Sequence, residues 1–589
     1  MIEATLATNF EPGTNLQGDM VSADWRFLLP ELRHKEMLCL GVPRRASLKV
    51  IATLAKQVVV VSVDDARMSA MRESCRQSRI ENFVCVSVAD YGRLEFGENC
   101  FPLIYLPRRE ETTAFLQRAD LRTKIFALLS ENGVVCYQER GFGDRTRSRA
   151  LILEFERGGE GASRSFWVTP FSGEMRTAIP VRQKHISKFF FRNVIFGQSW
   201  KKRLLSSIGH GLSSVGLIDT VAPRRNVFLQ KSDKTAAAAA PPEFLRAIAG
   251  KAGVDLETYR LGLSTRGKYN ANKVIYFLFE KRSQQPEVIV KMTRAGEFNY
   301  RLENEFKALS HLKAHSLVEP GSFPEPLFLD VHNGLALLAQ KAVHGAPFRT
   351  RTDATPDCPL AQQALDWLVK LGKSSADRTL ATGADAARVL GKLYHRFREV
   401  YQLSNEEDAF LTQQVAILAS STAGFPLVFQ HGDPGIWNIL VSPEGQVIFI
   451  DWEAGEPLGM PLWDIFYFMR TFASWVSRTQ GSRDPMKNFS SNFLQPSPFV
   501  KKLRHTLPDY CKGIQLDTDL IEPLFYTCWM HRALKECSRL TTVTLADGHY
   551  FNLLKRCIAE RENKTLQSLL LRNFNGQMQP EALASGFVQ

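Results

Sequence analysis

The segment from Phe429 to Glu453 carries the side chains whose types and spacing are best suited to chemistry. Asp433 and Asn438 lie five residues apart in one polar stretch, and Asp451 follows the apolar run Ile448–Ile450 after a Pro-Glu-Gly sequence that indicates a hairpin. Phosphoryl transfer requires such a set. One carboxylate orients or deprotonates the attacking hydroxyl, while the amide oxygen and the second carboxylate hold Mg²⁺ against nucleotide phosphates. Since this chemistry depends on positioning and charge neutralisation, the flanking strands must hold these groups in fixed places.

At Phe429–Val441 and Val447–Glu453 the sequence resembles the aminoglycoside phosphotransferase and choline kinase family, which is related to the protein kinases. The resemblance extends over about residues 244–570. It implies that Asp433 is the catalytic base and that Asn438 and Asp451 are the Mg²⁺ ligands. It also implies ATP as the phosphoryl donor.

Two further residues are expected to support this loop. The resemblance implies that His431 is a structural residue that braces it. Beyond the loop, Gly459–Ile465 resembles the following segment of the family, in which an aspartate begins a helix. Asp464 is therefore expected to brace the loop rather than to contact the substrate.

A nucleotide-binding lobe should precede the loop. Val274–Glu280 and Glu287–Met292 alternate like two strands joined by a polar turn, and Lys291 stands where the family carries the lysine that contacts the nucleotide phosphates. In the next predicted helix Glu305 shares the apolar face, whereas Glu303 points about 100° away from Leu302. Because an inward-facing acid needs a partner, the sequence predicts a Lys291–Glu305 ion pair.

Two segments of this lobe are candidates for nucleotide contact. The turn Ser264–Asn270, which contains Gly267, is suited to cover phosphates. Leu335–Gln340 followed by Lys341–Gly345 indicates the strand and hinge against which adenine would lie.

The first part of the chain alternates strands and helices in a different way. Apolar strands are predicted at residues 37–41, 57–63, 83–88, 103–106 and 133–138, with a helix at 48–56 after the first. Such dense apolar runs favour strands covered on both faces, which is typical of a doubly wound α/β fold. The expected fold class is thus a Rossmann-like α/β domain followed by an α+β bilobal protein-kinase-like domain.

Over about residues 22–230 the order of elements resembles class I S-adenosylmethionine-dependent methyltransferases. The resemblance rests on Asp24–Pro30 before the first strand, the Val-rich second strand, Asn82–Val86 leading to Asp90, and Arg203–Val227 as closing strands. The turn Gly41–Ser47 departs from the family because it keeps only one glycine and adds a proline and two arginines.

The ribose-binding acid of the family falls on Ser62, with Asp64 two residues later. We therefore expect a degenerate methyltransferase-like domain, and S-adenosylmethionine is not an expected cofactor.

Composition sets the domain plan. The chain of 589 residues is 44% hydrophobic and 23% charged, which is ordinary globular composition. Five alanines and two prolines mark a break, so the predicted parts are 22–230 (methyltransferase-like), 231–243 (linker), 244–572 (kinase-like) and 573–589 (tail).

The 10 cysteines are scattered without zinc spacing, and neither a signal peptide nor a bilayer-spanning apolar run is evident, so a cytoplasmic protein with reduced thiols is expected.

The net charge of +13 is concentrated in the first 240 residues, which contain about 35 Lys and Arg against about 25 Asp and Glu. Within this part, Arg182–Arg203 interleaves basic and aromatic residues. An inward-packed lid is the favoured interpretation of this segment, and peripheral contact with an anionic membrane is the less favoured one. No nucleic-acid-binding motif accompanies it, so a nucleic acid partner is not expected.

The leading functional hypothesis is an ATP- and Mg²⁺-dependent phosphotransferase acting on a hydroxyl of a small molecule. A sugar, glycan precursor or related metabolite is favoured over a polycationic aminoglycoside, because the kinase-like half is nearly neutral and lacks an acidic cluster near its end. Two alternatives remain: a non-catalytic nucleotide-sensing module on a methyltransferase-like scaffold, and a bifunctional methyltransferase-kinase.

Overall fold

The computed structural model describes residues 11–170, 173–195, 200–231, 239–281, 283–419 and 424–571. The chain divides into two compact units. Unit 1 comprises Met1–Leu16, Lys307–Pro324 and His344–Gln589, and unit 2 comprises Gln17–Phe306 and Glu325–Val343. The predicted tail 573–589 and positions 232–238 of the predicted linker lie outside the described residues.

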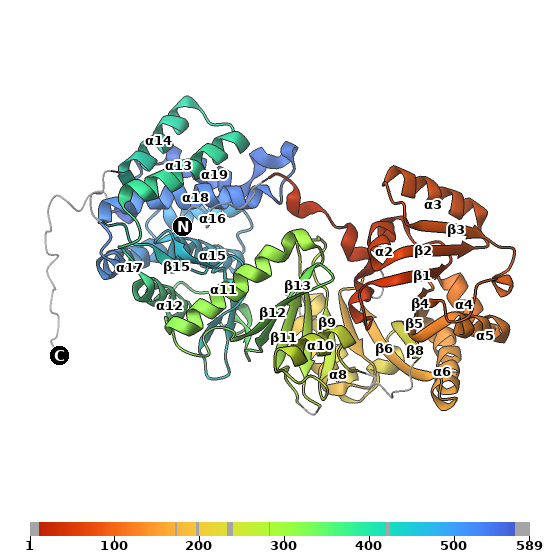
Figure 1. Cartoon of the computed structure of the whole chain (residues 1–589). Helices are drawn as coiled ribbons and strands as arrows, with labels where there is room; N and C mark the ends of the chain where they lie inside the picture. Colours follow the sequence, from red (N-terminus) through yellow and green to blue (C-terminus); the bar gives the residue numbers. More distant parts are fainter. Residues whose placement is uncertain are drawn as a thin grey trace. The chain divides into compact units, whose positions relative to one another are not determined.

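A single mixed sheet of 13 strands organises the described part of unit 2 and can be followed in Figure 1. In spatial order its strands are β12 (Pro326–His332), β13 (Leu335–Lys341), β11 (Val288–Met292), β10 (Val274–Phe279), β9 (Arg260–Ser264), β7 (Thr177–Pro180), β6 (Gly161–Thr169), β8 (Arg224–Lys231), β5 (Leu129–Arg140), β4 (Phe101–Tyr105), β1 (His34–Leu40), β2 (Ala55–Ser62) and β3 (Phe83–Ser87).

One end of this sheet has the doubly wound arrangement. Strands β3, β2, β1, β4 and β5 are parallel in that order, with Met37 opposite Val58 and Leu103 opposite Val134. Strands β8 and β6 continue the sheet in antiparallel pairing. The order 3-2-1-4-5 is that of Rossmann-like folds. The predicted fold class is therefore confirmed, and the buried valines of β2 explain its continuous apolar sequence.

The same sheet continues into the strands of the lobe predicted to bind nucleotide. Strand β7 pairs with β9, with Thr177 opposite Ser264 and Ala178 opposite Leu263. Strands β9, β10, β11, β13 and β12 then follow in antiparallel pairs. The Ala/Pro segment does not divide the two units, because the described residues on both sides of it belong to unit 2. Ala239 is buried and accepts a hydrogen bond from Leu261 N at 2.8 Å.

Helices cover this sheet. They are α2 (Leu48–Leu54), α3 (Asp65–Gln77), α4 (Arg109–Gln117), α5 (Ala119–Leu128), α6 (Gly141–Arg157), α7 (Lys184–Phe189), α8 (Trp200–Ser214), α9 (Ile218–Val221), α10 (Glu243–Lys251) and the first half of α11 (Asn299–His315). The expectation of a closing strand beginning at Arg203 is wrong, because this residue lies in α8 and the closing strand β8 begins at Arg224.

The basic and aromatic segment Arg182–Arg203 directs phenylalanines inward, although its residues 196–199 lie outside the described chain. Phe190 and Phe191 are buried in a cluster with Trp167 and Phe279. The ring of Phe189 lies 5.6 Å from that of Phe277 in β10, measured between centroids. This packing agrees with the inward-packed lid and covers β10.

Unit 1 is mainly helical. Its helices are the second half of α11, α12 (Pro359–Ser375), α13 (Gly383–Val400), α14 (Asn405–Ala419), α15 (Trp463–Thr479), α16 (Pro485–Phe493), α17 (Pro498–Ile514), α18 (Ile521–Cys537), α19 (His549–Ala559) and α20 (Lys564–Leu569). Its strands are β14 (Ala346–Pro347), β15 (Val428–Gln430), β16 (Ile439–Val441), β17 (Val447–Phe449) and β18 (Glu456–Gly459).

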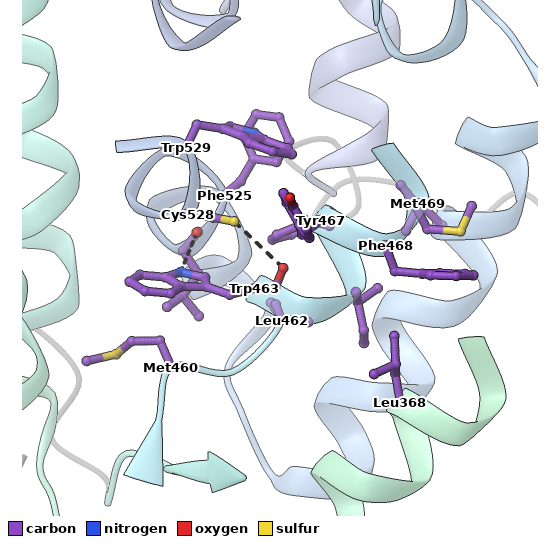
Figure 2. Packing of buried hydrophobic residues seen from close by; sticks show 14 of the residues in the cluster. Leu368, Met460, Leu462, Trp463, Tyr467, Phe468, Met469, Phe525, Cys528 and Trp529 are labelled. Carbon is purple, nitrogen blue, oxygen red and sulfur yellow. Dashed lines mark hydrogen bonds between the residues drawn. The ribbon is translucent and has the colours of Figure 1, made fainter. Parts of the chain in front are cut away.

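The core of unit 1 packs aromatic side chains of α15 against those of α18, as Figure 2 shows. Trp463 donates from its indole nitrogen to Leu524 O at 3.0 Å, and its own carbonyl accepts from the Cys528 thiol at 3.7 Å. These bonds fix the start of α15, where Asp464 lies. In the described residues, no helix has the length and apolar character needed to cross a bilayer.

Candidate active site

The loop between β15 and β16 carries His431, Asp433 and Asn438. Gly432 within it has φ +74°, and a side chain there would collide with the carbonyl of Ala454. Glycine is therefore required for the close approach of these two backbone segments. A short 3₁₀ turn, Ile436–Asn438, ends the loop and leads directly into β16.

Asp464 and His431 hold the backbone of this loop. The buried carboxylate of Asp464 accepts hydrogen bonds from His431 N at 2.6 Å and Gly432 N at 3.1 Å. His431 Nδ1 accepts from Asp433 N at 3.2 Å, and its Nε2 is 3.1 Å from Ile450 O. Burial lowers the pKa of His431, so we assign the neutral tautomer that donates from Nε2. Such hydrogen bonds to the loop backbone are expected of residues that hold the loop in place.

Asn438 is oriented by Asp433. Its amide nitrogen donates to Asp433 O at 2.9 Å and to Asp433 Oδ2 at 3.2 Å. Because both bonds use the NH₂ group, the amide oxygen is left as the acceptor end of the side chain. The Asp433 side chain is 33% exposed, so its carboxylate is open to an incoming molecule.

The β16–β17 hairpin brings Asp451 to the same end as Asn438. Ile439 lies opposite Phe449, and Ile450 N donates to Asn438 O at 2.9 Å. Asp451 follows immediately with φ +71°, a left-handed conformation in which aspartate is among the better tolerated residues.

One amide oxygen and one carboxylate fit Mg²⁺, which usually keeps waters and takes further ligands from substrate phosphates. Within the described ranges, no cluster of three His, Cys, Asp or Glu side chains offers a complete all-protein metal cage.

Two basic residues of α18 escaped sequence analysis. Arg532 Nη1 lies 3.8 Å from Asp433 Oδ1, and its guanidinium is 3.4 Å from the centroid of the Tyr467 ring. Lys535 Nζ donates to Gly432 O at 3.4 Å. Both cations are largely or fully covered by the protein, so they place positive charge beneath the loop. The available signal was that Arg532 and Lys535 lie three positions apart in a helix rich in apolar and aromatic residues, since buried cations require partners.

Glu456 of β18 faces the same buried cations, and it makes the stability of the protein pH-dependent. Burial raises its pKa to about 7, opposed by the charge of Lys535. Between the ordinary pKa of a glutamate and about 7, the folded chain holds a proton that the unfolded chain has released. The free energy of unfolding is therefore expected to fall by about 3 kcal/mol as the pH rises through this window.

Urea unfolding of the wild type and of Glu456→Gln at pH 5, 6, 7 and 8, roughly the span of this window, checks this expectation. The variant should lose less stability than the wild type on going to higher pH. Parallel curves for the two proteins would contradict the assignment to Glu456.

In unit 2, the predicted ion pair between Lys291 and Glu305 is present. Lys291 is the second-last residue of β11, and Glu305 lies on α11 with a fully buried side chain. Lys273 Nζ approaches the other carboxylate oxygen of Glu305 at 3.8 Å. Gly267 lies in the turn after β9 with φ +100°, where a side chain would collide with that of Asn272. The roles of Lys291, Glu305 and Gly267 in nucleotide binding stay predictions.

The crevice at the carboxyl ends of β1 and β4 is where doubly wound sheets bind ligands. Here the chain fills it with its own side chains. A Cβ on Gly41 would lie 2.5 Å from the Glu111 carboxyl, and Arg108 Nε donates to Val42 O at 2.6 Å across the crevice. Tyr91 donates to Glu111 at 3.1 Å. Glu111 thus lies close to the backbone at Gly41, which a bound S-adenosylmethionine would have to approach, and the expectation that this cofactor does not bind stays a prediction.

No curated protein matches this chain significantly. Among solved structures, the YcgJ protein from Bacillus subtilis shares 10% identity over 36% of this chain and 98% of its own, with a TM-score of 0.24. A putative sarcosine dimethylglycine methyltransferase from Galdieria sulphuraria shares 12% identity over 36% of this chain and 84% of its own, with a TM-score of 0.21.

A structure of WbdD with a kinase inhibitor shares 13% identity over 85% of this chain and 87% of its own, with a TM-score of 0.21. Because these TM-scores are low, the fold assignment rests on the strand order described above. The model of the family described as "Phosphotransferase enzyme family" matches residues 270–486, which include Lys291, Glu305 and the whole loop with Asp433, Asn438 and Asp451. The match of residues 270–486 to this family supports a kinase-type enzyme.

Proposed function

We propose that this protein is an ATP- and Mg²⁺-dependent phosphotransferase that transfers the γ-phosphoryl group to a hydroxyl of a small molecule. The observation that carries the proposal is the loop in which the Asn438 amide is locked onto Asp433 while Asp451 lies at the same end of the hairpin. The match of residues 270–486 to the phosphotransferase family supports it.

In this proposal each residue has a distinct task. Asp433 orients the acceptor hydroxyl and takes its proton, and Asn438 and Asp451 hold Mg²⁺. The metal ion neutralises charge on the phosphates as the transferred group leaves. Lys291 contacts the nucleotide phosphates, and Glu305 holds its ammonium in place.

We further propose an uncharged or weakly charged acceptor, such as a sugar, a glycan precursor or a related metabolite. Arg532 and Lys535 place positive charge under the catalytic loop. A polycationic acceptor would be repelled there, because like charges in a partly covered site cost several kcal/mol. An aminoglycoside is therefore disfavoured as the acceptor.

The bifunctional alternative requires methyl transfer by the N-terminal half. The Glu111 carboxyl beside Gly41 argues against it, because it lies where the backbone would have to approach S-adenosylmethionine. Titration of the full chain with S-adenosylmethionine should give no binding heat.

Nucleotide binding tests the proposed function. Replacing Lys291 with Met is expected to weaken Mg²⁺–ATP binding by about tenfold or more, because a hydrogen bond from a charged group is lost. Glu305→Gln should have a smaller effect in the same direction. Glu303→Gln on the same helix serves as the matched control and should bind like the wild type. Calorimetric titration measures all four proteins; equal affinities would contradict the assigned role of Lys291.

A further inference from the structure

An ion pair within unit 2 joins the segment before β1 to the nucleotide-binding strands. Arg294, two residues after β11, contacts Asp24 through Nη2 at 2.9 Å and through Nε at 3.0 Å. Both side chains have no exposed surface. Burying two charges is costly, and a buried pair often stabilises a fold no better than apolar residues would. Stability alone therefore does not explain why these two charges are buried together.

The remaining donors of Arg294 give that explanation. Its guanidinium donates to Thr265 O at 2.6 Å, to Asn272 O at 2.8 Å and to Tyr269 O at 3.2 Å. Thr265 and Asn272 lie at the two ends of the turn 264–272 after β9, and Tyr269 lies between them. One rigid, planar group thus ties both ends of the turn, and Asp24 fixes the orientation of that group.

Residues 17–20 hold the same turn from outside. Asn270 N donates to Gln17 O at 2.7 Å, and Asn270 Oδ1 accepts from Met20 N at 3.0 Å. The Asn270 amide nitrogen also donates to Asp19 Oδ1 at 2.6 Å. Gly18 passes so close that a Cβ there would lie 2.5 Å from Lys268 O. The segment therefore lies directly against the backbone of the turn.

The turn leads straight to the Lys291–Glu305 pair. Lys273, one residue beyond Asn272, approaches Glu305 at 3.8 Å. Arg301 of α11 donates to Ala271 O at 3.2 Å. Lys273 and Lys291 thus both lie beside Glu305, one on each carboxylate oxygen. Arg294 follows Lys291 by three residues, just after the end of β11.

We propose that residues 17–26 form a clamp that positions the turn 264–272 for the phosphates of the nucleotide, with Asp24 and Asp19 as positioning residues. The methyltransferase-like half would then be part of the nucleotide site's framework rather than a separate module. This inference rests on the proposed function, because it assigns the turn to phosphate contact.

The test uses the full chain and three variants. Asp19→Ala removes a partly exposed anchor of Asn270, and Asp24→Asn removes the charge that orients Arg294. Asp120→Ala is the matched control, since this exposed aspartate pairs with Arg118 in the same half. Affinities for Mg²⁺–ATP and for adenosine are measured by calorimetry, and the exchange of amide hydrogens in residues 264–272 is followed by mass spectrometry.

The clamp predicts that Asp19→Ala weakens Mg²⁺–ATP binding about fivefold, as loss of one hydrogen bond would, while adenosine binds as before. Exchange in the turn should be faster in Asp19→Ala and faster still in Asp24→Asn. The control should match the wild type in every readout. If Asp24→Asn does not fold, Asp19→Ala carries the test alone.

Two results would overturn the clamp: unchanged Mg²⁺–ATP affinity and exchange in Asp19→Ala, or an equal loss of ATP and adenosine affinity, which indicates general destabilisation. A wild-type protein that binds neither ligand would instead contradict the proposed function. Hydrogen exchange would then still decide whether residues 17–26 order the turn.

Discussion

Replacing Asp433 with alanine is expected to lower the rate of phosphoryl transfer about a thousandfold, within the range measured for general bases. Mg²⁺–ATP binding should be retained, because Asn438 and Asp451 keep their backbone positions in the hairpin. The rate is measured as ADP release in the presence of hydroxylated acceptors.

Asp509→Ala is the control for this variant, since its exposed carboxylate pairs with Lys373 elsewhere in unit 1. Its rate should equal that of the wild type. Asp433→Ala also removes the anion that lies 3.8 Å from Arg532, so a small loss of thermal stability is expected. Circular dichroism separates that loss from an unfolded variant. A wild-type rate in folded Asp433→Ala would contradict the assignment of the catalytic base.

A fragment consisting of residues 239–571 is expected not to form the folded kinase-like domain, although the composition break precedes it. It lacks Asp24, and a buried Arg294 without its partner costs about 3–5 kcal/mol. It also exposes the edge of β9, which pairs with β7 in the intact chain. Phe277 and Phe279 also lose their ring contacts with Phe189 of α7.

Co-expression of residues 11–231 with residues 239–571 is the matched control, because every contact named above is non-covalent. The two fragments are expected to purify together and to unfold in one cooperative transition. Size-exclusion chromatography and thermal denaturation measure both samples. A fragment 239–571 that is monomeric and unfolds cooperatively alone would contradict the shared sheet as a requirement for folding.

Much of the structure around the candidate site follows from local patterns. Alternation predicts β10 and β11, and the apolar stripe of α11 places Glu305 inward, where only a nearby cation can compensate it. Lys291 on β11 is the cation that pairs with Glu305. The hairpin around Asp451 follows from its turn residues in the same way.

Long-range contacts leave no such local trace. Asp24 and Arg294 are separated by 270 positions, and each looks like an ordinary surface residue in sequence. The pairing of β7 with β9 is equally non-local, so the Ala/Pro break suggested a division that the compact units do not follow. Arg532 could not be assigned from the sequence for the same reason, because Asp433, which it faces, lies far away along the chain.

The loop with Asp433 is expected to catalyse transfer of a phosphoryl group to a hydroxyl. The most direct measurement incubates the full chain with γ-labelled ATP and a panel of neutral sugars and related polyols, with and without Mg²⁺, and locates the label. Label is expected on an acceptor hydroxyl only when Mg²⁺ is present, and no label is expected with Asp433→Ala. Tight Mg²⁺–ATP binding without labelled product from any acceptor would contradict catalysis and favour a nucleotide-sensing module.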